Sequence, residues 1–362
     1  MPLDPRSVVD FLLEHDTLEP EDVLDRGLTV TEVPRRNANF AVRRRGAPGV
    51  FVKQSRAHDP IQASSLHVEG VVARAAADDP AFARVAALSP ALRVYDQSER
   101  VLVLELVDAE DLATLAEREG GVPPVVARAL GEAVGALHRD VPSSAAEGAP
   151  GPQQAWILSS PHLSDAELPP RGGQAVRDLR RVARENRELS DGLRELRESW
   201  RSDAFLHGDL KWENVLATPD GDDVRIHLVD WELGGYGDAA WDLGGLLHAY
   251  LRAWVAAMPP DALAAGAPPP DTGALEAMAP SIAALWAGYR DAAHPADARD
   301  TLLRGVRFAG ARLFQTAFEH VAETALLTGV TVGLAQLAAN VMARPAEACS
   351  ALFGLRSPDA AR

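Results

Sequence analysis

The first hundred residues contain short runs in which apolar and polar positions alternate or apolar residues cluster between polar turns, as in β-strands. Five such runs occur: Leu28 to Val33, Phe40 to Arg43, Gly49 to Lys53, Leu92 to Tyr95 and Val101 to Val107. Residues 4–15 and 65–77 instead repeat apolar positions at helical spacing. The sequence therefore predicts that residues 1–107 form a small lobe, built on a five-stranded sheet with helices.

The rest of the chain is mainly helical in its periodicity. Helical spacing recurs over residues 125–138, 174–200, 241–258, 275–289 and from residue 300 onwards. Residues 108–362 are therefore predicted to form a second, mostly helical lobe. Within it, residues 321–343 are apolar enough to suggest a membrane span, but Glu323, Gln336 and Asn340 interrupt the run. A buried helix is the better interpretation, and no membrane partner is expected.

Residues 205–242 depart from this simple periodicity and carry the candidate chemistry. His207, Asp209 and Asn214 have the spacing H-x-D-x4-N, and Asp230 follows an apolar run that reads as the second strand of a hairpin. Transfer of a phosphoryl group to a hydroxyl needs a carboxylate that orients the hydroxyl and accepts its proton, and oxygen ligands that hold magnesium beside the phosphates. The sequence predicts that Asp209 is this base and that Asn214 and Asp230 are the Mg²⁺ ligands.

A candidate nucleotide contact lies upstream. Lys53 ends the third predicted strand, where its ammonium can reach the α and β phosphates of ATP if an acid on a neighbouring helix holds it. Glu69, sixteen residues later (69 − 53), is the candidate acid. A surface lysine and a solvated glutamate are the alternative, but the order of these residues before the catalytic stretch favours the nucleotide role.

Composition narrows the choice of partners and compartment. The net charge of −16 has the wrong sign for a nucleic-acid partner and suits a neutral or cationic acceptor. Cys349 is the single cysteine, so no disulfide framework or cysteine-based zinc site is expected. The first residues lack the basic start and apolar run of a signal peptide. Together these features predict a cytoplasmic protein.

Two sequence runs carry a resemblance to known enzymes: HGDLKWEN, which begins at His207, and GDAAWDLG, which begins at Gly237. Both resemble the aminoglycoside phosphotransferase and choline kinase families, which share the protein kinase-like fold. The resemblance implies an α+β, bilobal structure with a five-stranded antiparallel sheet in the N-terminal lobe and a mostly helical C-terminal lobe. It also implies that Asp242 is a structural carboxylate beneath the catalytic loop and that His207 braces this loop.

The same resemblance assigns further residues. Lys211 lies two residues after the base, where Ser/Thr protein kinases place an ammonium beside the transferred phosphate. A solvated loop lysine is the alternative. In this fold the last strand leads into the interlobe hinge, so the backbone of Glu105, Leu106 and Val107 is expected to bind the adenine. The alternative is that these three are merely buried strand residues.

The turn of residues 34–39 departs from the protein-kinase pattern. It contains no glycine, so its backbone amides cannot approach phosphate closely. The side chains of Arg35, Arg36 or Asn37 are the candidates for this phosphate contact, and a plain surface turn is the alternative.

A softer resemblance concerns the acceptor. Lys211, seven arginines within residues 174–200 and the tail of residues 336–355 are similar to the kinases of class V lanthipeptide and thioamitide pathways. This resemblance implies a Ser or Thr acceptor on a peptide and a partner lyase. Residues 174–200 also carry glutamates, so a solvated helix face is the alternative there. A small-molecule acceptor, such as an aminoglycoside or a choline-like alcohol, and a non-catalytic pseudokinase remain the alternative functions.

Overall fold

The predicted five-stranded sheet is present in the computed structural model, with all neighbouring strands antiparallel in the order β1-β2-β3-β5-β4. Its strands are β1 (Thr29–Pro34), β2 (Ala38–Arg44), β3 (Ala47–Gln54), β4 (Leu92–Asp96) and β5 (Val101–Glu105). The structure describes residues 2–24, 27–34, 37–55, 60–142, 154–164, 173–221, 223–259, 262 and 272–355.

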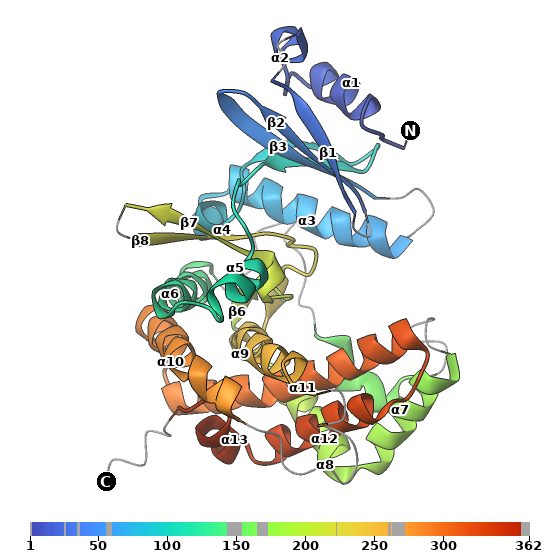
Figure 1. Ribbon diagram of the computed structural model, residues 1–362, viewed down its shortest axis with the longest axis vertical. Helices are drawn as coiled ribbons and strands as arrows, with labels where there is room; N and C mark the ends of the chain where they lie inside the picture. The colour runs from blue at the N-terminus through green and yellow to red at the C-terminus, as the bar shows by residue number, and fades with distance from the viewer. Residues whose placement is uncertain are drawn as a thin grey trace.

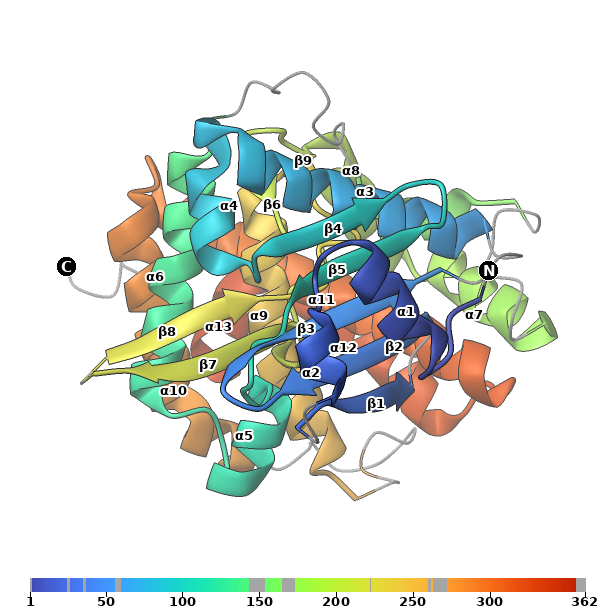
Figure 2. The same ribbon diagram turned by 90° about the horizontal axis from the view of Figure 1, so that it is seen from above.

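Helices cover both faces of this sheet (Figures 1 and 2). On one face lies α1 (Ser7–Glu14), whose Phe11 belongs to the same apolar cluster as Phe40 of β2. On the other face lies α3 (Pro60–Asp78), whose Leu66 packs against Leu102 of β5. Because β5 lies between β3 and β4 and is covered on both faces, its residues 101–104 are apolar without alternation. Short helices complete this part of the chain: α2 (Pro20–Leu24), η1 (Pro80–Phe82) and α4 (Ala83–Leu88).

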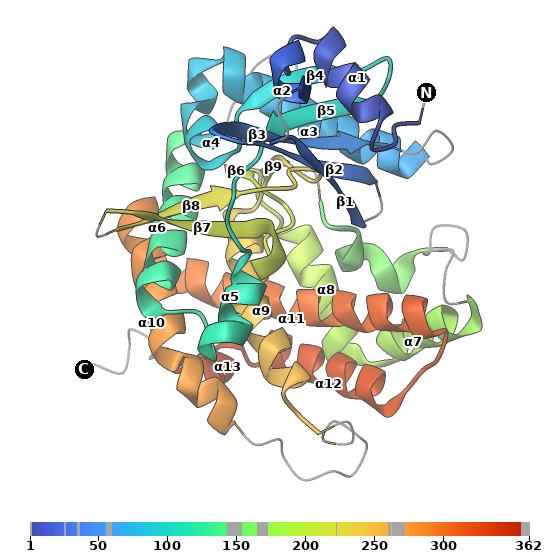
Figure 3. The same cartoon turned by 45° about the horizontal axis from the view of Figure 1, so that its top comes forward.

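The second lobe is mostly helical, as predicted, and has one large apolar core. Its helices are α5 (Leu112–Glu119), α6 (Pro124–Asp140), η2 (Trp156–His162), α7 (Gly173–Glu185), α8 (Arg187–Glu198), α9 (Ala239–Ala256), α10 (Gly273–Ala293), α11 (Ala298–Thr324), α12 (Gly329–Ala343) and α13 (Pro345–Ala351). Helix α10 packs along α6, and α11 packs against both α9 and α12 (Figure 3). The predicted lobe division after residue 107 falls between β5 and α5.

Two predicted helical runs are each divided in the structure. Residues 174–200 form α7 and α8, because Asn186 ends the first helix and its side chain accepts a hydrogen bond from the amide of Leu189 at 3.0 Å, capping the second. Residues 321–343 likewise contain the end of α11 and the whole of α12, separated by residues 325–328. In the described ranges, no helix is both long and apolar enough to cross a membrane.

The catalytic stretch, residues 205–242, leaves the helical lobe and returns to it through a β-hairpin. The predicted hairpin is present as β7 (Val215–Asp220) and β8 (Asp223–Leu228), preceded by the short helix η3 (Trp212–Asn214). The two ends of this stretch are joined by a strand pair that the sequence pattern did not reveal, β6 (Ala204–Leu206) with β9 (Gly235–Gly237). The loop after β6 and the end of β8 are therefore brought together.

Candidate active site

The catalytic loop of residues 207–211 rests on α9. Both oxygens of the buried Asp242 carboxylate accept backbone hydrogen bonds, Oδ2 from the amide of His207 at 2.7 Å and Oδ1 from the amide of Gly208 at 2.9 Å. Burial alone would raise the pKa of Asp242, but hydrogen bonds and the nearby His138 and His207 lower it. The expectation that Asp242 supports the loop from below is confirmed.

The loop is also tied to the hairpin and to a neighbouring turn. The ring Nε2 of His207 lies 2.9 Å from the carbonyl oxygen of Val229, at the end of β8, which confirms its bracing contact. Gly208 has φ = +83°, and a Cβ atom there would lie 2.2 Å from the carbonyl oxygen of Leu233. Only glycine permits this backbone conformation and this close approach. Gly208 therefore fixes the path of the backbone that leads into Asp209.

Asp209 is held by two cations. Its Oδ2 accepts a hydrogen bond from Lys211 at 2.5 Å, and its Oδ1 accepts from both Nη atoms of Arg312 at 3.2 Å. Burial would raise the pKa of Asp209, but the positive charges of Arg312 and Lys211 lower it to about 2. Asp209 is thus ionised at neutral pH. The structure therefore places Lys211 directly against the carboxylate, rather than free in solvent.

Asn214 and Asp230 lie next to this carboxylate. The Nδ2 of Asn214 donates to the carbonyl oxygen of Asp209 at 3.0 Å, and the amide of Val229 donates to the carbonyl oxygen of Asn214 at 3.0 Å. Asp230 follows immediately with φ = +69°, a conformation that costs a non-glycine residue energy and is found at functional sites. The hairpin therefore brings together the two predicted metal ligands.

The donor set fits a divalent cation that prefers oxygen. The Oδ1 atom of Asn214 is buried and has no hydrogen-bond partner among the described residues, although buried polar atoms are nearly always paired. Asp230 supplies carboxylate oxygens beside it. Within the described part of the chain, no group of three or more His, Cys, Asp or Glu side chains could hold a metal. The hard-oxygen pair of Asn214 and Asp230 is instead typical of magnesium bound together with phosphates.

Lys53 connects the sheet to the hairpin. Its ammonium donates to both oxygens of Glu69 at 2.8 Å and to Oδ1 of Asp230 at 2.7 Å, across 177 residues of sequence. Burial would lower the pKa of Lys53, but the charges of Glu69 and Asp230 raise it. Of the two acids that share this lysine, Glu69 has its pKa raised by burial, while Lys53 lowers that of Asp230. The predicted Lys53–Glu69 pair therefore forms, and it reaches the predicted metal ligand.

The hinge differs in part from its prediction. The amide of Glu105 donates to the carbonyl oxygen of Ala91 at 2.8 Å, and that of Leu106 donates to Gly49 at 2.9 Å. These two amides are therefore used within the sheet and cannot donate to adenine. Val107 provides the remaining amide of the three, and the carbonyl oxygens remain candidate acceptors.

The turn of residues 34–39 has unpaired amide side chains. Arg35 and Arg36 lie outside the described residues, whereas the Oδ1 atoms of Asn37 and Asn39 are buried without a partner in the described ranges. Asn39 lies directly opposite Lys53 in the β2–β3 ladder, so both side chains leave the same face of the sheet. Asn39 was missed by the sequence analysis, although its strand position relative to Lys53 was a usable signal.

Arg312 was also missed. It lies in α11, a helix of 27 residues in which we recognise no catalytic motif. The available signal was an arginine on the apolar, core-facing side of a helix, where a charge requires a partner. The partner itself, 103 residues away in sequence, could not be identified without the fold.

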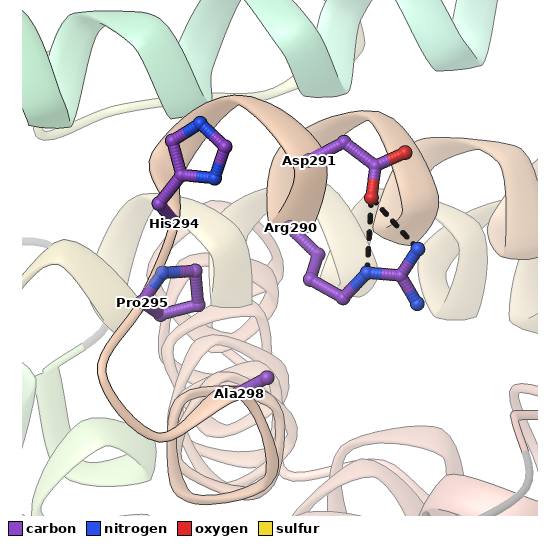
Figure 4. A pocket seen from close by; sticks show the side chains of 5 residues that line it. All are labelled: Arg290, Asp291, His294, Pro295 and Ala298. Carbon is purple, nitrogen blue, oxygen red and sulfur yellow. Dashed lines mark hydrogen bonds and ion pairs between the residues drawn. The ribbon is translucent and has the colours of Figure 1, made fainter.

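A separate hollow is lined by none of these residues. It has a volume of about 510 Å³ and adjoins the C-terminal end of α10, lined by Arg290, Asp291, His294, Pro295 and Ala298 (Figure 4). Its guanidinium and carboxylate bind each other at 2.7 and 3.0 Å. None of the predicted site residues lines it, so it is not the phosphotransfer site.

Comparisons with known proteins agree with this geometry. The family model for the phosphotransferase enzyme family matches residues 29–280, which include every predicted site residue. The comparison with curated proteins gives no match. Among solved structures, an ethanolamine kinase from Plasmodium vivax has a TM-score of 0.58 at 11% identity, covering 94% of this chain and 88% of that one.

Two further structures have the same fold. A choline kinase from Cryptosporidium parvum has a TM-score of 0.54 at 12% identity, covering 95% of this chain and 96% of that one. The GDP complex of aminoglycoside 2'-phosphotransferase-IIIa has a TM-score of 0.51 at 12% identity, covering 95% of this chain and all (100%) of the other. At such identities the likeness establishes the protein kinase-like fold.

Proposed function

Because this chain belongs to the phosphotransferase enzyme family and is an ATP-dependent phosphotransferase acting on hydroxyl groups, we propose that its acceptor is a Ser or Thr side chain of a peptide. The pathway would be the synthesis of a ribosomal peptide natural product of the lanthipeptide or thioamitide type. The phosphorylated peptide then passes to a partner lyase, which eliminates the phosphate.

The proposal gives each site residue one role. Asp209 orients the acceptor hydroxyl and takes its proton, while Lys211 lies beside the transferred phosphoryl group. Family membership implies ATP and a divalent metal, and we propose that Asn214 and Asp230 hold this metal as Mg²⁺. The ion neutralises charge on the phosphates when bound. Lys53, held by Glu69, contacts the α and β phosphates, and it exchanges its contact with Asp230 for them.

The remaining assignments concern the nucleotide base and the turn. In the hinge, the amide of Val107 and the carbonyl oxygen of Glu105 are the groups that we propose for the adenine, because the amides of Glu105 and Leu106 are used in the sheet. Asn37 is the proposed side-chain contact to phosphate in the turn of residues 34–39. It replaces the backbone amides that a glycine-rich turn would supply.

The low pKa of Asp209 constrains the mechanism. A carboxylate with a pKa of about 2 is a weak base. It therefore does not deprotonate the acceptor hydroxyl before the phosphoryl group moves. This fits a loose transition state, in which the bond from the γ-phosphorus to the bridging oxygen is largely broken before the acceptor oxygen bonds. The acceptor proton then passes to Asp209, and ADP leaves with the bridging oxygen. Orientation of the hydroxyl is therefore the main task of Asp209.

Charges of both signs surround the base. Asp209 is contacted by Lys211 and Arg312. The carboxylates of Asp230 and Glu232 add negative charge beside these cations. The charge of the site is therefore compatible with a peptide hydroxyl and also with the neutral or cationic acceptor that the net charge of the chain suggested.

The surface of helix α7 supports a peptide acceptor with acidic residues. Its exposed surface includes Arg177, Arg181 and Arg184, and Arg187 begins the next helix. Asp178 pairs with Arg181, and Gln174 accepts from Arg177. Exposed arginines on one segment are typical of surfaces that bind acidic peptides.

A small-molecule acceptor is the second candidate. The ethanolamine and choline kinases that share this fold phosphorylate small alcohols, as their names state.

One observation supports the proposed phosphotransfer site. The 2.7 Å contact between Lys53 and Asp230 joins the sheet to the hairpin that follows Asn214. A lysine for the phosphates and oxygen ligands for a metal are parts that phosphoryl transfer requires.

The test is transfer of labelled γ-phosphate from Mg-ATP to four acceptors: a Ser/Thr-rich peptide with an acidic leader, an aminoglycoside, choline and a neutral sugar alcohol. We expect label on the peptide. The Asp209→Asn variant should bind Mg-ATP as the parent does but lose about a hundredfold or more in transfer, because it lacks the carboxylate that orients the hydroxyl and takes its proton. Label only on the aminoglycoside or choline would reject the peptide, and parent-like transfer by the variant would reject the base assignment.

A further inference from the structure

Arg312 reaches the catalytic loop from α11, the helix that packs against α9. It lies in α11 and is only 5% exposed. Its two Nη atoms lie 3.2 Å from Oδ1 of Asp209, and Nη2 also donates to the carbonyl oxygen of Leu210 at 3.2 Å. One guanidinium thus binds the side chain of the base and the backbone beside it.

We propose that Arg312 is a positioning residue that fixes the orientation of the Asp209 carboxylate towards the acceptor hydroxyl. This inference rests on the proposed function. A carboxylate offers about four lone-pair positions to hydrogen-bond donors. The two Nη atoms of Arg312 occupy Oδ1, and Lys211 occupies one position on Oδ2. The acceptor hydroxyl is therefore directed to the remaining position on Oδ2, which otherwise has only a long, 3.4 Å contact from Asn214.

The guanidinium can orient a carboxylate because it is itself fixed. Its Cζ lies 4.8 Å from the ring centre of Trp241, over the ring, and that indole donates to the carbonyl oxygen of Gly208 at 2.8 Å. Helix α9 also leaves space for it at Gly245. A Cβ atom there would lie 2.6 Å from the carbonyl oxygen of Leu210 and 3.2 Å from Nη2 of Arg312. The contact between loop, α9 and α11 therefore depends on the absence of a side chain at this position.

An arginine is suited to this task in a way that a lysine is not. Its planar group presents donors in a rigid fork, so it can bind Asp209 and the carbonyl oxygen of Leu210 at once. A lysine keeps the positive charge but has one flexible ammonium. An Arg312→Lys variant therefore keeps the positive charge beside Asp209 but loses the rigid fork that orients its carboxylate.

The experiment measures phosphate release from Mg-ATP with water as the acceptor, for the parent, Arg312→Ala and Arg312→Lys. For the alanine variant we expect kcat to fall about tenfold to a hundredfold, because misplacing a reacting group by about 1 Å can cost about a hundredfold in rate. Its KM for ATP should stay close to that of the parent, since Arg312 does not contact the predicted nucleotide residues. The kcat of Arg312→Lys should lie between that of the parent and that of Arg312→Ala. Guanidinium chloride at non-denaturing concentrations should restore part of the kcat of the alanine variant.

The same helix supplies a matched control. Arg304, about two turns earlier, is 8% exposed, binds Asp238 and the carbonyl oxygen of Ser199, and lies over the ring of Phe308. Arg304→Ala likewise removes a buried guanidinium and leaves a buried carboxylate, but it does not touch the catalytic loop. We expect it to lose stability while keeping the kcat of the parent and gaining nothing from guanidinium.

The outcomes separate the two proposals. Parent-like kcat in Arg312→Ala, or an equal loss in Arg304→Ala, would overturn the positioning role while leaving the proposed function intact. A parent protein that neither binds Mg-ATP nor releases phosphate would overturn the proposed function, and the role of Arg312 with it.

Discussion

Asp242, below the catalytic loop, and three buried asparagines on the side of the hairpin and the sheet differ in how completely their side-chain oxygen atoms are paired. Below the loop, Asp242 receives two backbone amides and lies 3.2 Å from His138 Nε2. On the side of the hairpin and the sheet, the Oδ1 atoms of Asn214, Asn37 and Asn39 are buried without partners in the described chain. Folded proteins pair nearly all such atoms. We therefore call Asp242 and its donors the saturated side, which acts as scaffold, and the three asparagines the unsaturated side, where we expect ligand atoms to complete the hydrogen bonding.

The largest effect on stability should come from breaking the saturated side. Asp242→Ala leaves two buried amides without an acceptor, and each such loss costs about 1–3 kcal/mol, so we expect the free energy of unfolding to fall by roughly 2–6 kcal/mol. Denaturant unfolding measures this change. Asp242→Asn, which keeps one acceptor oxygen, should lose less. A stability equal to that of the parent in the alanine variant would contradict the scaffold role.

On the unsaturated side, the largest effect should be on binding. Asp230→Ala removes a proposed metal ligand, so we expect Mg²⁺-dependent binding of a non-hydrolysable ATP analogue to disappear. Calorimetry with and without Mg²⁺ measures this, and chelation of the metal should make the parent behave like the variant. Asp220→Ala is the matched control, because Asp220 lies in the same hairpin but is exposed and paired with Arg225. Unchanged affinity of Asp230→Ala in excess Mg²⁺ would reject the ligand assignment.

The same contrast explains what the sequence could predict. Asp209, Asn214 and Asp230 were predictable because they lie within one loop and one hairpin, and a hairpin brings its ends together whatever surrounds it. The pairing of Lys53 with Glu69 was predictable because a strand followed by a helix on one face of the sheet has few arrangements.

Contacts that depend on tertiary packing were not predictable. Arg312 reaches Asp209 only because α11 packs closely against α9 at Gly244 and Gly245 leaves room for the guanidinium. The amides of Glu105 and Leu106 are used by the carbonyl oxygens of Ala91 and Gly49, and no local pattern reveals which strand neighbour takes an amide. The division at Asn186 had a local signal, because a capping residue interrupts the helical run, but the periodicity on both sides concealed it.

The smallest effect should come from Asn39, and it should change stability and binding in opposite directions. This side chain is 3% exposed, and its Oδ1 has no partner in the described ranges, so burying it costs free energy in the protein without nucleotide. Asn39→Leu replaces the amide with an apolar group of similar size. We expect the free energy of unfolding to rise by up to about 1 kcal/mol, because the variant no longer buries an unpaired amide.

The same variant should bind Mg-ATP several-fold more weakly, since a single neutral hydrogen bond is worth about 0.5–1.5 kcal/mol. Thermal unfolding and calorimetry measure the two quantities on one sample. Ala41→Val is the matched control, because Ala41 is also buried in β2, lies on the same face and carries no polar group. If Asn39→Leu weakened the fold and left nucleotide affinity unchanged, the unpaired amide would belong to the scaffold, and the contrast between the two sides of the loop would fail at this residue.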